Sequence, residues 1–168
     1  MWGLFMEGKL RNMTSIYLLK GEKALLLYRQ GGRVVSDVWT GSAGGHFEDY
    51  ELNDAKACVI RELNEELRLC ESDIENLTLK YITLRRVKGE IRQNYYFFAN
   101  IKDDVDDNLV SNEGKVNWFS LKEIRDLEMP YTAKYVIDHF CSIGQFTNEM
   151  YTGVANGNEV VFVGLPEF

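Results

Sequence analysis

The chain is poor in the residues on which secreted and nucleic-acid-binding proteins depend. Its 168 residues include only three cysteines and two prolines, and its 19 lysines and arginines are outnumbered by 26 aspartates and glutamates. Cys58, Cys70 and Cys141 are odd in number and lack metal-ligand spacing, so we expect reduced thiols in a cytosolic protein, with Cys58 a small buried one. The net charge of −7 argues against a broad nucleic-acid or anionic-membrane surface, because both partners require clustered basic residues.

Long apolar runs are absent as well. No stretch is long enough to span a membrane, and the N-terminus lacks the basic start and apolar run of an export signal. Residues 1–12 are interpreted as a frayed lead-in. The composition, 45% hydrophobic and 27% charged, is that of one ordinary globular domain with a sizeable core. The sequence therefore predicts a single cytoplasmic domain over residues 1–168.

One acidic segment carries most of the information, GGHFEDYELNDAKACVIRELNEELRL from Gly44 to Leu69. Residues three and four apart share a face of a helix, so Glu62, Glu65 and Glu66 are predicted to lie on one narrow stripe. An adjoining stripe is apolar and would bury against a sheet. It consists of Val59, Ile60, Leu63 and Leu67. The two stripes indicate a helix that packs with one face and binds with the other.

The acidic stripe indicates a bound cation, because each pair of like charges at this spacing destabilises a helix by a few tenths of a kcal/mol. Oxygen-only ligands favour a hard ion such as Mg²⁺, which takes one or two carboxylates and keeps positions for water and phosphate oxygens. Gly44 and Gly45 follow a predicted strand over residues 37–43 and would let a backbone group approach a metal or phosphate. A merely solvated acidic helix would leave these glycines and Arg61 without a reason.

With these residues in register, the segment resembles the Nudix hydrolase family, whose box reads Gly, five residues, Glu, seven residues, then Arg-Glu-apolar-x-Glu-Glu-x-Gly-apolar. The chain departs from the box twice: nine residues separate Glu51 from Arg61, and Arg68 stands where the family has glycine. The first departure predicts a longer loop or helix start, and the second predicts a helix that runs on or ends with a different turn. The positions that match in type are Gly45, Glu51, Arg61, Glu62, Leu63, Glu65, Glu66 and Leu69.

The resemblance implies a role for the residues of the box. Glu65 and Glu66 would ligate Mg²⁺, with Mn²⁺ as a substitute, and the Gly44 carbonyl would supply a further ligand. Glu62 would ligate the metal or help to deprotonate water, and Arg61 would orient a glutamate by ion pairing. The implied catalytic residues are therefore Arg61, Glu62 and Glu66.

Residues beyond the metal ligands would select the substrate. Trp39, just before the glycine loop, is the first candidate to stack on a base, and Gly45 is assigned to the same substrate site. The family often adds an acid from a later loop, for which Glu113 is the candidate and the alternative to Glu62 as general base. Phosphate contacts are considered for four arginines whose simpler explanation is solvated strand charge. They are Arg33, Arg85, Arg86 and Arg92.

The rest of the sequence predicts strands and helices around the box. Strand-like runs cover residues 14–20, 23–29, 81–87, 91–101 and 116–120, and a final hairpin over 150–163 turns at Asn156-Gly157. Helices are expected over 121–127 and 131–143, and His139 would pack on the second. These elements predict an α+β fold with a mixed sheet flanked by helices, and the resemblance implies the Nudix-type α/β/α sandwich.

The resemblance implies Mg²⁺-dependent hydrolysis of a nucleoside diphosphate linked to another moiety, and so a small-molecule nucleotide partner. A nucleoside triphosphate such as an oxidised purine nucleotide, releasing pyrophosphate, is the first expectation, because the chain has no extra domain for a larger substrate. ADP-ribose, a nucleotide sugar and a dinucleoside polyphosphate stay open, as do a non-catalytic nucleotide-sensing module and a homodimer. Retention of Arg61 and three glutamates argues against the sensor.

Overall fold

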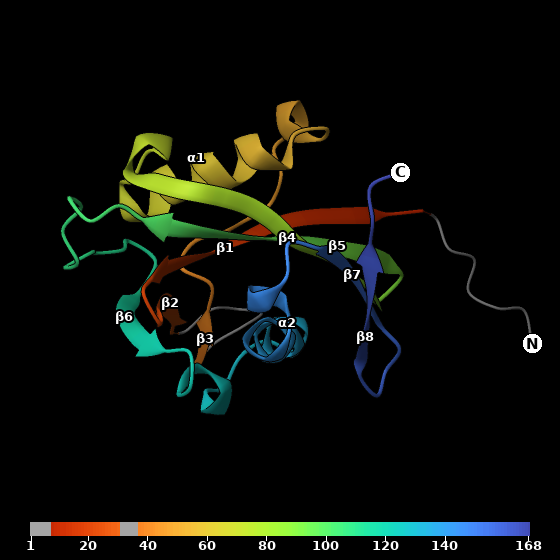
Figure 1. Cartoon of the computed structure of the whole chain (residues 1–168). Coiled ribbons are helices and arrows are strands. Elements are labelled where there is room, and N and C mark those ends of the chain that lie inside the picture. The colour runs from red at the N-terminus through yellow and green to blue at the C-terminus, as the bar shows by residue number, and fades with distance from the viewer. Residues whose placement is uncertain (1–7, 31–36) are drawn as a thin grey trace, which may run out of the picture.

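A mixed eight-stranded sheet separates two α-helices in the computed structural model, which describes residues 8–30 and 37–168 (Figure 1). The strand order is β3-β2-β1-β5-β4-β7-β8, and β6 pairs with the other edge of β2. The strands are β1 (Leu10–Lys20), β2 (Lys23–Arg29), β3 (Val38–Thr40), β4 (Ile74–Val87), β5 (Glu90–Ile101), β6 (Lys115–Ser120), β7 (Met150–Ala155) and β8 (Val160–Leu165). The helices are α1 (Ala55–Leu67) and α2 (Tyr131–Ser142), with short 3-10 turns at η1 (Asp49–Glu51), η2 (Glu71–Asp73), η3 (Ile124–Asp126) and η4 (Gly144–Phe146). The predicted α+β fold with helices on both sides of a mixed sheet is confirmed.

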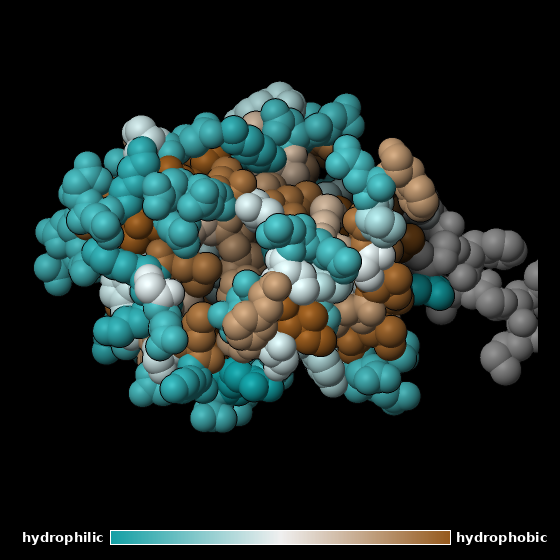
Figure 2. Space-filling model, viewed as in Figure 1, coloured by the Kyte–Doolittle hydropathy of each residue, from teal (hydrophilic) through white to brown (hydrophobic). Residues whose placement is uncertain are grey.

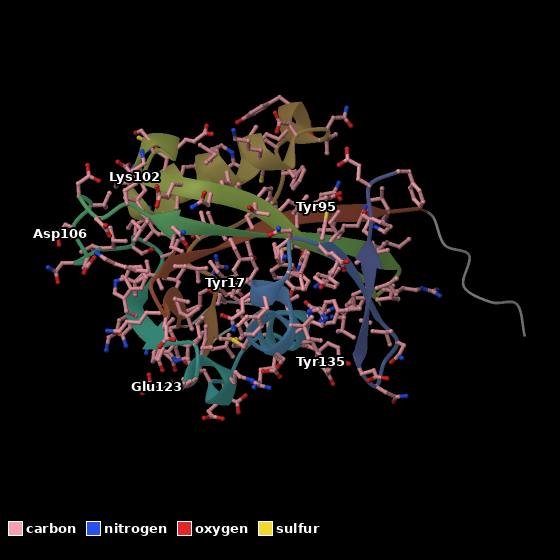
Figure 3. All side chains as sticks on the ribbon, viewed as in Figure 1. Tyr17, Tyr95, Lys102, Asp106, Glu123 and Tyr135 are labelled. Atoms are coloured by element: carbon pink, nitrogen blue, oxygen red, sulfur yellow. The ribbon has the colours of Figure 1, made fainter. Side chains whose placement is uncertain are left out.

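The central strand β1 contributes to both layers of the molecule. It forms a hairpin with β2 and pairs in parallel with β5 along most of its length. Because side chains alternate across a strand, Ile16 and Leu18 enter the core under α1, whereas Tyr17 enters the core under α2. Figure 3 shows the same division in the sheet, with Tyr17 and Tyr95 on opposite faces.

The two cores differ in composition. On the α1 side the predicted apolar stripe is buried, with Val59, Leu63 and Leu67 packed against aliphatic residues of β1, β2 and β5. The α2 side is aromatic, and the rings of Phe98 and Phe140 stack with centroids 3.9 Å apart. His139 lies in this second core with its Nδ1 2.9 Å from the Tyr81 hydroxyl, so the prediction that it is a packed residue is confirmed.

Several elements begin or end at other residues than the sequence predicts. β1 starts at Leu10, within the expected lead-in, because it pairs with β5 from that residue onward. β3 covers only Val38–Thr40 of the expected strand, since the chain then turns so that Ser42 bonds to β1 and β2. The expected helix over 121–127 is a single 3-10 turn. β4 begins at Ile74, seven residues before the predicted strand, because it also pairs with the end of β5.

β8 ends the sheet and leaves an apolar face uncovered. Val161, Val163 and Leu165 are 45%, 63% and 49% exposed, and Figure 2 shows hydrophobic side chains at the surface along this strand. Within the described ranges, no helix has both the length and the apolar character needed to cross a bilayer.

Both ends of α1 are defined by caps. Asp54 accepts a hydrogen bond from the Ala57 N–H at 2.9 Å, which satisfies one of the free donors of the first turn. At the other end the Arg68 N–H donates to the Asn64 carbonyl, and Arg68 adopts a φ of 59°, in the left-handed region. The prediction that the helix runs on or ends with a different turn is therefore wrong. Arg68 takes the left-handed conformation that a glycine usually provides.

Replacing Arg68 with glycine is expected to raise the free energy of unfolding by about 1 kcal/mol, because a left-handed conformation costs a residue with a Cβ roughly that amount. Urea denaturation followed by circular dichroism measures the change. The control is Arg68→Ala, which keeps the Cβ and should give no gain. Equal stabilities for the glycine and alanine variants would show that Arg68 is not strained.

Candidate functional site

Arg61 holds the acidic residues of α1 together. Its guanidinium makes two hydrogen bonds to Glu51, from Nε to Oε1 at 2.7 Å and from Nη2 to Oε2 at 2.9 Å. Its Nη1 donates to Glu62 at 2.8 Å and to Glu65 at 3.1 Å, and Nη2 also reaches the His46 carbonyl at 3.0 Å. One side chain therefore fixes three carboxylates relative to the loop that precedes the helix.

Glu51 contacts Arg61 although the spacing between them is two residues longer than in the box. The added length lies after η1, in the turn over residues 52–54 that precedes α1. Glu51 is 1% exposed, and its carboxylate also accepts the Glu48 N–H at 2.9 Å. The hydrogen bonds from Arg61 lower the pKa of Glu51 despite its burial, so this carboxylate stays charged.

The glycine pair lies against the acidic side chains. A Cβ on Gly45 would come within 2.3 Å of Glu62 Oε1, and a Cβ on Gly44 would come within 2.2 Å of the Thr14 carbonyl oxygen. The Gly44 N–H donates to Glu66 Oε2 at 3.2 Å. Only glycine therefore lets the loop pass this closely between β1 and the carboxylates of α1.

Glu66 is the most perturbed of the acids. It is 7% exposed, and burial raises its pKa to about 7. This value includes the charge of Arg29, whose Nη2 lies 3.5 Å from Glu66 Oε1 and which lowers the pKa, and the charges of Glu62 and Glu113, which add to the effect of burial. Burial also raises the pKa of Glu62. The negative charge at this place is incompletely balanced by the protein itself.

A cavity of about 320 Å³, here called the acidic cavity, opens over these groups. Its carboxylates come from α1, from Glu48 ahead of η1 and from the loop before β6. In that last loop Asn112 Nδ2 donates to the Glu65 carbonyl at 3.2 Å and ties the loop to the helix. Glu113, the loop acid proposed from the sequence, therefore lines the same cavity as the glutamates of the box. The acids that line it are Glu48, Glu62, Glu65, Glu66 and Glu113.

No three histidine, cysteine or acidic side chains in the described part of the chain are already placed as a metal cluster. In this arrangement Arg61 engages Glu62 and Glu65. The residues nevertheless fit a hard divalent cation, because all the donors are oxygens and, besides burial, the charges of Glu62 and Glu113 raise the pKa of Glu66. A cation between them would remove that repulsion.

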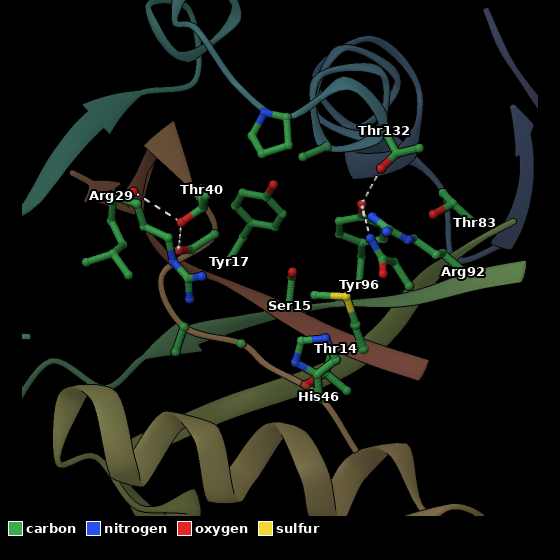
Figure 4. A pocket seen from close by; sticks show the side chains of 18 of the residues that line it. Thr14, Ser15, Tyr17, Arg29, Thr40, His46, Thr83, Arg92, Tyr96 and Thr132 are labelled. Carbon is green, nitrogen blue, oxygen red and sulfur yellow. Dashed lines mark hydrogen bonds between the residues drawn. The ribbon is translucent and has the colours of Figure 1, made fainter. Parts of the chain in front are cut away.

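A second cavity of about 410 Å³, the sheet cavity, continues from the acidic cavity between the sheet and the start of α2 (Figure 4). The two share Arg29, Gly44 and Glu66 in their linings. Its wall holds a hydrogen-bonded chain in which Asn94 Nδ2 donates to the Tyr96 hydroxyl and that hydroxyl donates to Thr132, both at 3.2 Å. The sheet cavity offers polar groups in a partly open space beside the acids.

Trp39 does not lie where a substrate contact requires it. Its ring packs against Tyr28 at 4.9 Å and Phe119 at 4.6 Å between centroids, and it is not among the residues that line the two cavities. The strand before the glycine loop was predicted, but its alternation turns this ring into the core. The aromatic side chains that do line the sheet cavity are Tyr17 and Tyr96.

The arginines considered from sequence separate into two groups. Arg85 and Arg92 line the sheet cavity, whereas Arg86 is exposed on the opposite face of β4, and Arg33 lies outside the described residues. Arg11 also lines the sheet cavity. The sequence did not predict this, because residues 1–12 were interpreted as a frayed lead-in. Alternation along a predicted strand would have placed Arg85 and Arg86 on opposite faces.

His46 and Arg29 were likewise not predicted from the sequence to line the site. Both line the two cavities, and His46 Nε2 accepts a hydrogen bond from Arg11 Nε at 2.6 Å. Partial burial and the charges of Arg11, Arg29 and Arg92 lower the pKa of His46, so its imidazole is neutral at pH 7. The buried, free thiol of Cys58 bonds to Thr14, as its predicted packing role requires.

Comparisons with known proteins agree with this geometry. The family model described as NUDIX domain matches residues 9–140. Among solved structures, the MutT protein from Bacillus halodurans superposes with a TM-score of 0.61 at 21% identity, covering 94% of this chain and 99% of that one. The MutT protein from Methanosarcina mazei gives 0.64 at 17%, covering 85% and 100%. An Ap4A hydrolase from C. elegans gives 0.59 at 20%, covering 79% and 94%. The comparison with curated proteins gives no match.

Proposed function

This chain belongs to the Nudix hydrolases, enzymes that cleave acid anhydrides, and on that premise we propose that it hydrolyses a nucleoside diphosphate linked to another moiety with the help of Mg²⁺. The observation that carries the proposal is the crowding of carboxylates around the acidic cavity beside two glycines. A nucleoside triphosphate such as an oxidised purine nucleotide, releasing pyrophosphate, remains the first substrate class to test.

The residues of the acidic cavity would hold the metal. Glu62, Glu65 and Glu66 are the proposed ligands, with the Gly44 carbonyl as a further one and Mn²⁺ as an accepted substitute. When bound, the metal supplies charge neutralisation on the phosphoryl oxygens and a water of lowered pKa. Arg61 positions Glu62 and Glu65 through the hydrogen bonds described above.

The protein's own groups would orient the substrate. Arg29 lies between the two cavities, beside Glu66, and its Nε has no hydrogen-bond partner, so it is placed to receive a phosphoryl oxygen. The missing Cβ of Gly45 lets the Glu62 carboxylate lie directly against the glycine loop, and we propose that the Gly45 backbone contacts the diphosphate. We propose that either Glu62 or Glu113 accepts a proton from the attacking water, since both line the acidic cavity.

The cellular setting follows from the same chemistry. The three cysteines are all free thiols, of which Cys58 is buried. We propose that the enzyme acts in the cytoplasm on a small nucleotide, where reducing conditions keep such thiols unpaired. A homodimer stays a prediction, to be checked by light scattering.

The proposal is tested by measuring phosphate and pyrophosphate release from a panel of compounds with and without Mg²⁺. The panel contains nucleoside triphosphates, oxidised purine nucleotides, ADP-ribose, a nucleotide sugar and dinucleoside polyphosphates. We expect metal-dependent product from one class and loss of that product on addition of EDTA. Absence of product from every compound, with binding still detectable by calorimetry, would favour the nucleotide-sensing alternative.

A further inference from the structure

Three arginines form a row across the sheet at the end of the sheet cavity. Arg11 of β1 pairs in register with Arg92 of β5, and Arg92 pairs in register with Arg85 of β4. Because residues directly opposite one another on neighbouring strands point to the same face, the three guanidinium groups lie side by side. All three line the sheet cavity, and Figure 4 shows Arg92 at the end of the cavity opposite Arg29.

The charges of this arginine row are poorly balanced by the protein. Arg92 Nε lies 3.3 Å from Glu90, and Arg11 donates to the neutral His46. Among the described residues, the Arg85 side chain makes no hydrogen bond or ion pair, although its backbone pairs with β5. Like charges placed directly opposite on adjacent strands destabilise a sheet. An anion bound between the arginines would relieve that repulsion.

A second, independent observation also points to a ligand in this cavity. Among the described residues, three buried side-chain polar atoms lack a hydrogen-bond partner, namely Tyr17 Oη, Arg29 Nε and Asn94 Oδ1. All three residues line the sheet cavity, and Tyr17 is 0% exposed. Because an unpaired buried polar group costs about 1–3 kcal/mol, these atoms are placed for the donors and acceptors of a bound molecule.

Arg85, at the end of the arginine row away from Arg11, lies too far from the acids to serve the phosphates that are cleaved. Gly44, whose N–H bonds Glu66, lies against Thr14 of β1. Arg85 is three residues further along the sheet and two strands across from β1, so its Cα lies about 14 Å from that of Thr14 at 3.3 Å per residue and 4.8 Å per strand. Adjacent phosphates of one polyphosphate chain are much closer together than this. The row therefore calls for a separate anionic group on the substrate.

We propose that the arginine row binds a phosphomonoester carried by the part of the substrate that fills the sheet cavity. The substrate is then a nucleotide with phosphate at both ends, a cleavable diphosphate over the acids and a terminal phosphate on the row. This inference rests on the proposed function, and it narrows the substrate class. Guanidinium groups suit this ligand because they bind phosphate oxygens through paired, charge-assisted hydrogen bonds.

The first test uses pairs of diphosphate compounds that differ by one phosphomonoester: coenzyme A with dephospho-coenzyme A, and NADPH with NADH. We expect the wild-type enzyme to prefer the phosphorylated member at least about tenfold in kcat/KM, which corresponds to about 1.4 kcal/mol. In Arg85→Gln the ratio should fall toward one. The matched control is Arg86→Gln, which removes a neighbouring arginine from the opposite face and should keep the wild-type ratio.

A second test does not depend on activity. Inorganic phosphate should raise the melting temperature of the wild type and of Arg86→Gln, and it should raise that of Arg85→Gln much less. If both members of each pair are hydrolysed equally, the inference is overturned while the proposed function stands. If nothing is hydrolysed but the phosphate shift requires Arg85, the anion site is supported and the proposed function fails. Equal phosphate shifts in all three proteins would overturn the inference.

Discussion

Glu66→Gln is expected to lower turnover by two or more orders of magnitude and, in the same molecule, to stabilise the metal-free fold above neutral pH. The first effect follows because the amide keeps the shape of the side chain but removes a charge proposed to bind the metal. Steady-state rates with the best substrate of the panel measure it. The second effect follows from burial, which raises the pKa of this carboxyl to about 7.

The sign of the stability change is fixed by proton binding. The ordinary pKa of the carboxyl is 4.5, so between that value and about 7 the folded protein binds a proton that the unfolded chain releases. Stability therefore falls as the pH rises through this window. At pH 8 the wild type should have lost about 3–4 kcal/mol that Glu66→Gln retains, at about 1.4 kcal/mol for each pKa unit between 4.5 and about 7. At pH 4.5 the two proteins should unfold alike.

Chemical denaturation at both pH values, in EDTA and in Mg²⁺, checks this expectation. Mg²⁺ should stabilise the wild type more than Glu66→Gln, because the metal replaces the missing positive charge. The control is Glu75→Gln on the exposed part of β4, which should change neither turnover nor the pH dependence. Wild-type turnover in Glu66→Gln would reject the proposed role of this residue, and a stability gap independent of pH would reject its burial as the cause.

Arg61→Lys is expected to lower the free energy of unfolding by about 3 kcal/mol and to lower kcat at least a hundredfold. Lysine keeps the charge but cannot make the paired bonds to Glu51, whose carboxylate is 1% exposed and would be left poorly compensated. Glu62 and Glu65 would also lose the group that positions them. Urea denaturation and steady-state kinetics measure the two effects.

A double variant separates the structural part of this effect from the catalytic part. Glu51→Leu combined with Arg61→Met removes both partners, and it should recover much of the stability without recovering turnover. Arg125→Lys is the matched control, because the Arg125–Asp138 pair is largely exposed and contributes little. If Arg61→Lys were as active as the wild type, the guanidinium would have no positioning role.

The parts of the site that depend on local sequence were predictable. Helical spacing alone places Glu62, Glu65 and Glu66 beside Arg61 on one side of α1, and the structure has them there. The caps were less predictable, because Arg68 adopts a conformation for which its residue type gives no signal. The longer spacing between Glu51 and Arg61 also hid their contact, because a short turn takes up the two extra residues and leaves the hydrogen bonds between them in place.

The parts that depend on strand pairing were not predictable in the same way. The arginine row exists only because β1 and β4 flank β5 in one particular register, and no spacing within a single segment encodes that register. Glu113 reaches the acids because β6 pairs with β2, which a loop acid seen in sequence cannot reveal. The position of Trp39 away from the two cavities has the same cause, as its packing partner Phe119 comes from β6.

The position of β1 between the two layers has a consequence for how this enzyme can diverge. Thr14 supports the glycine loop and the acids, while Arg11 and Tyr17, on the same strand, line the sheet cavity. Substitutions on β1 therefore alter chemistry and selectivity together. β4 and β5 line the sheet cavity without contributing to the acidic cavity. New specificities should accordingly accumulate on those two strands in related lineages, leaving the hydrolytic machinery intact.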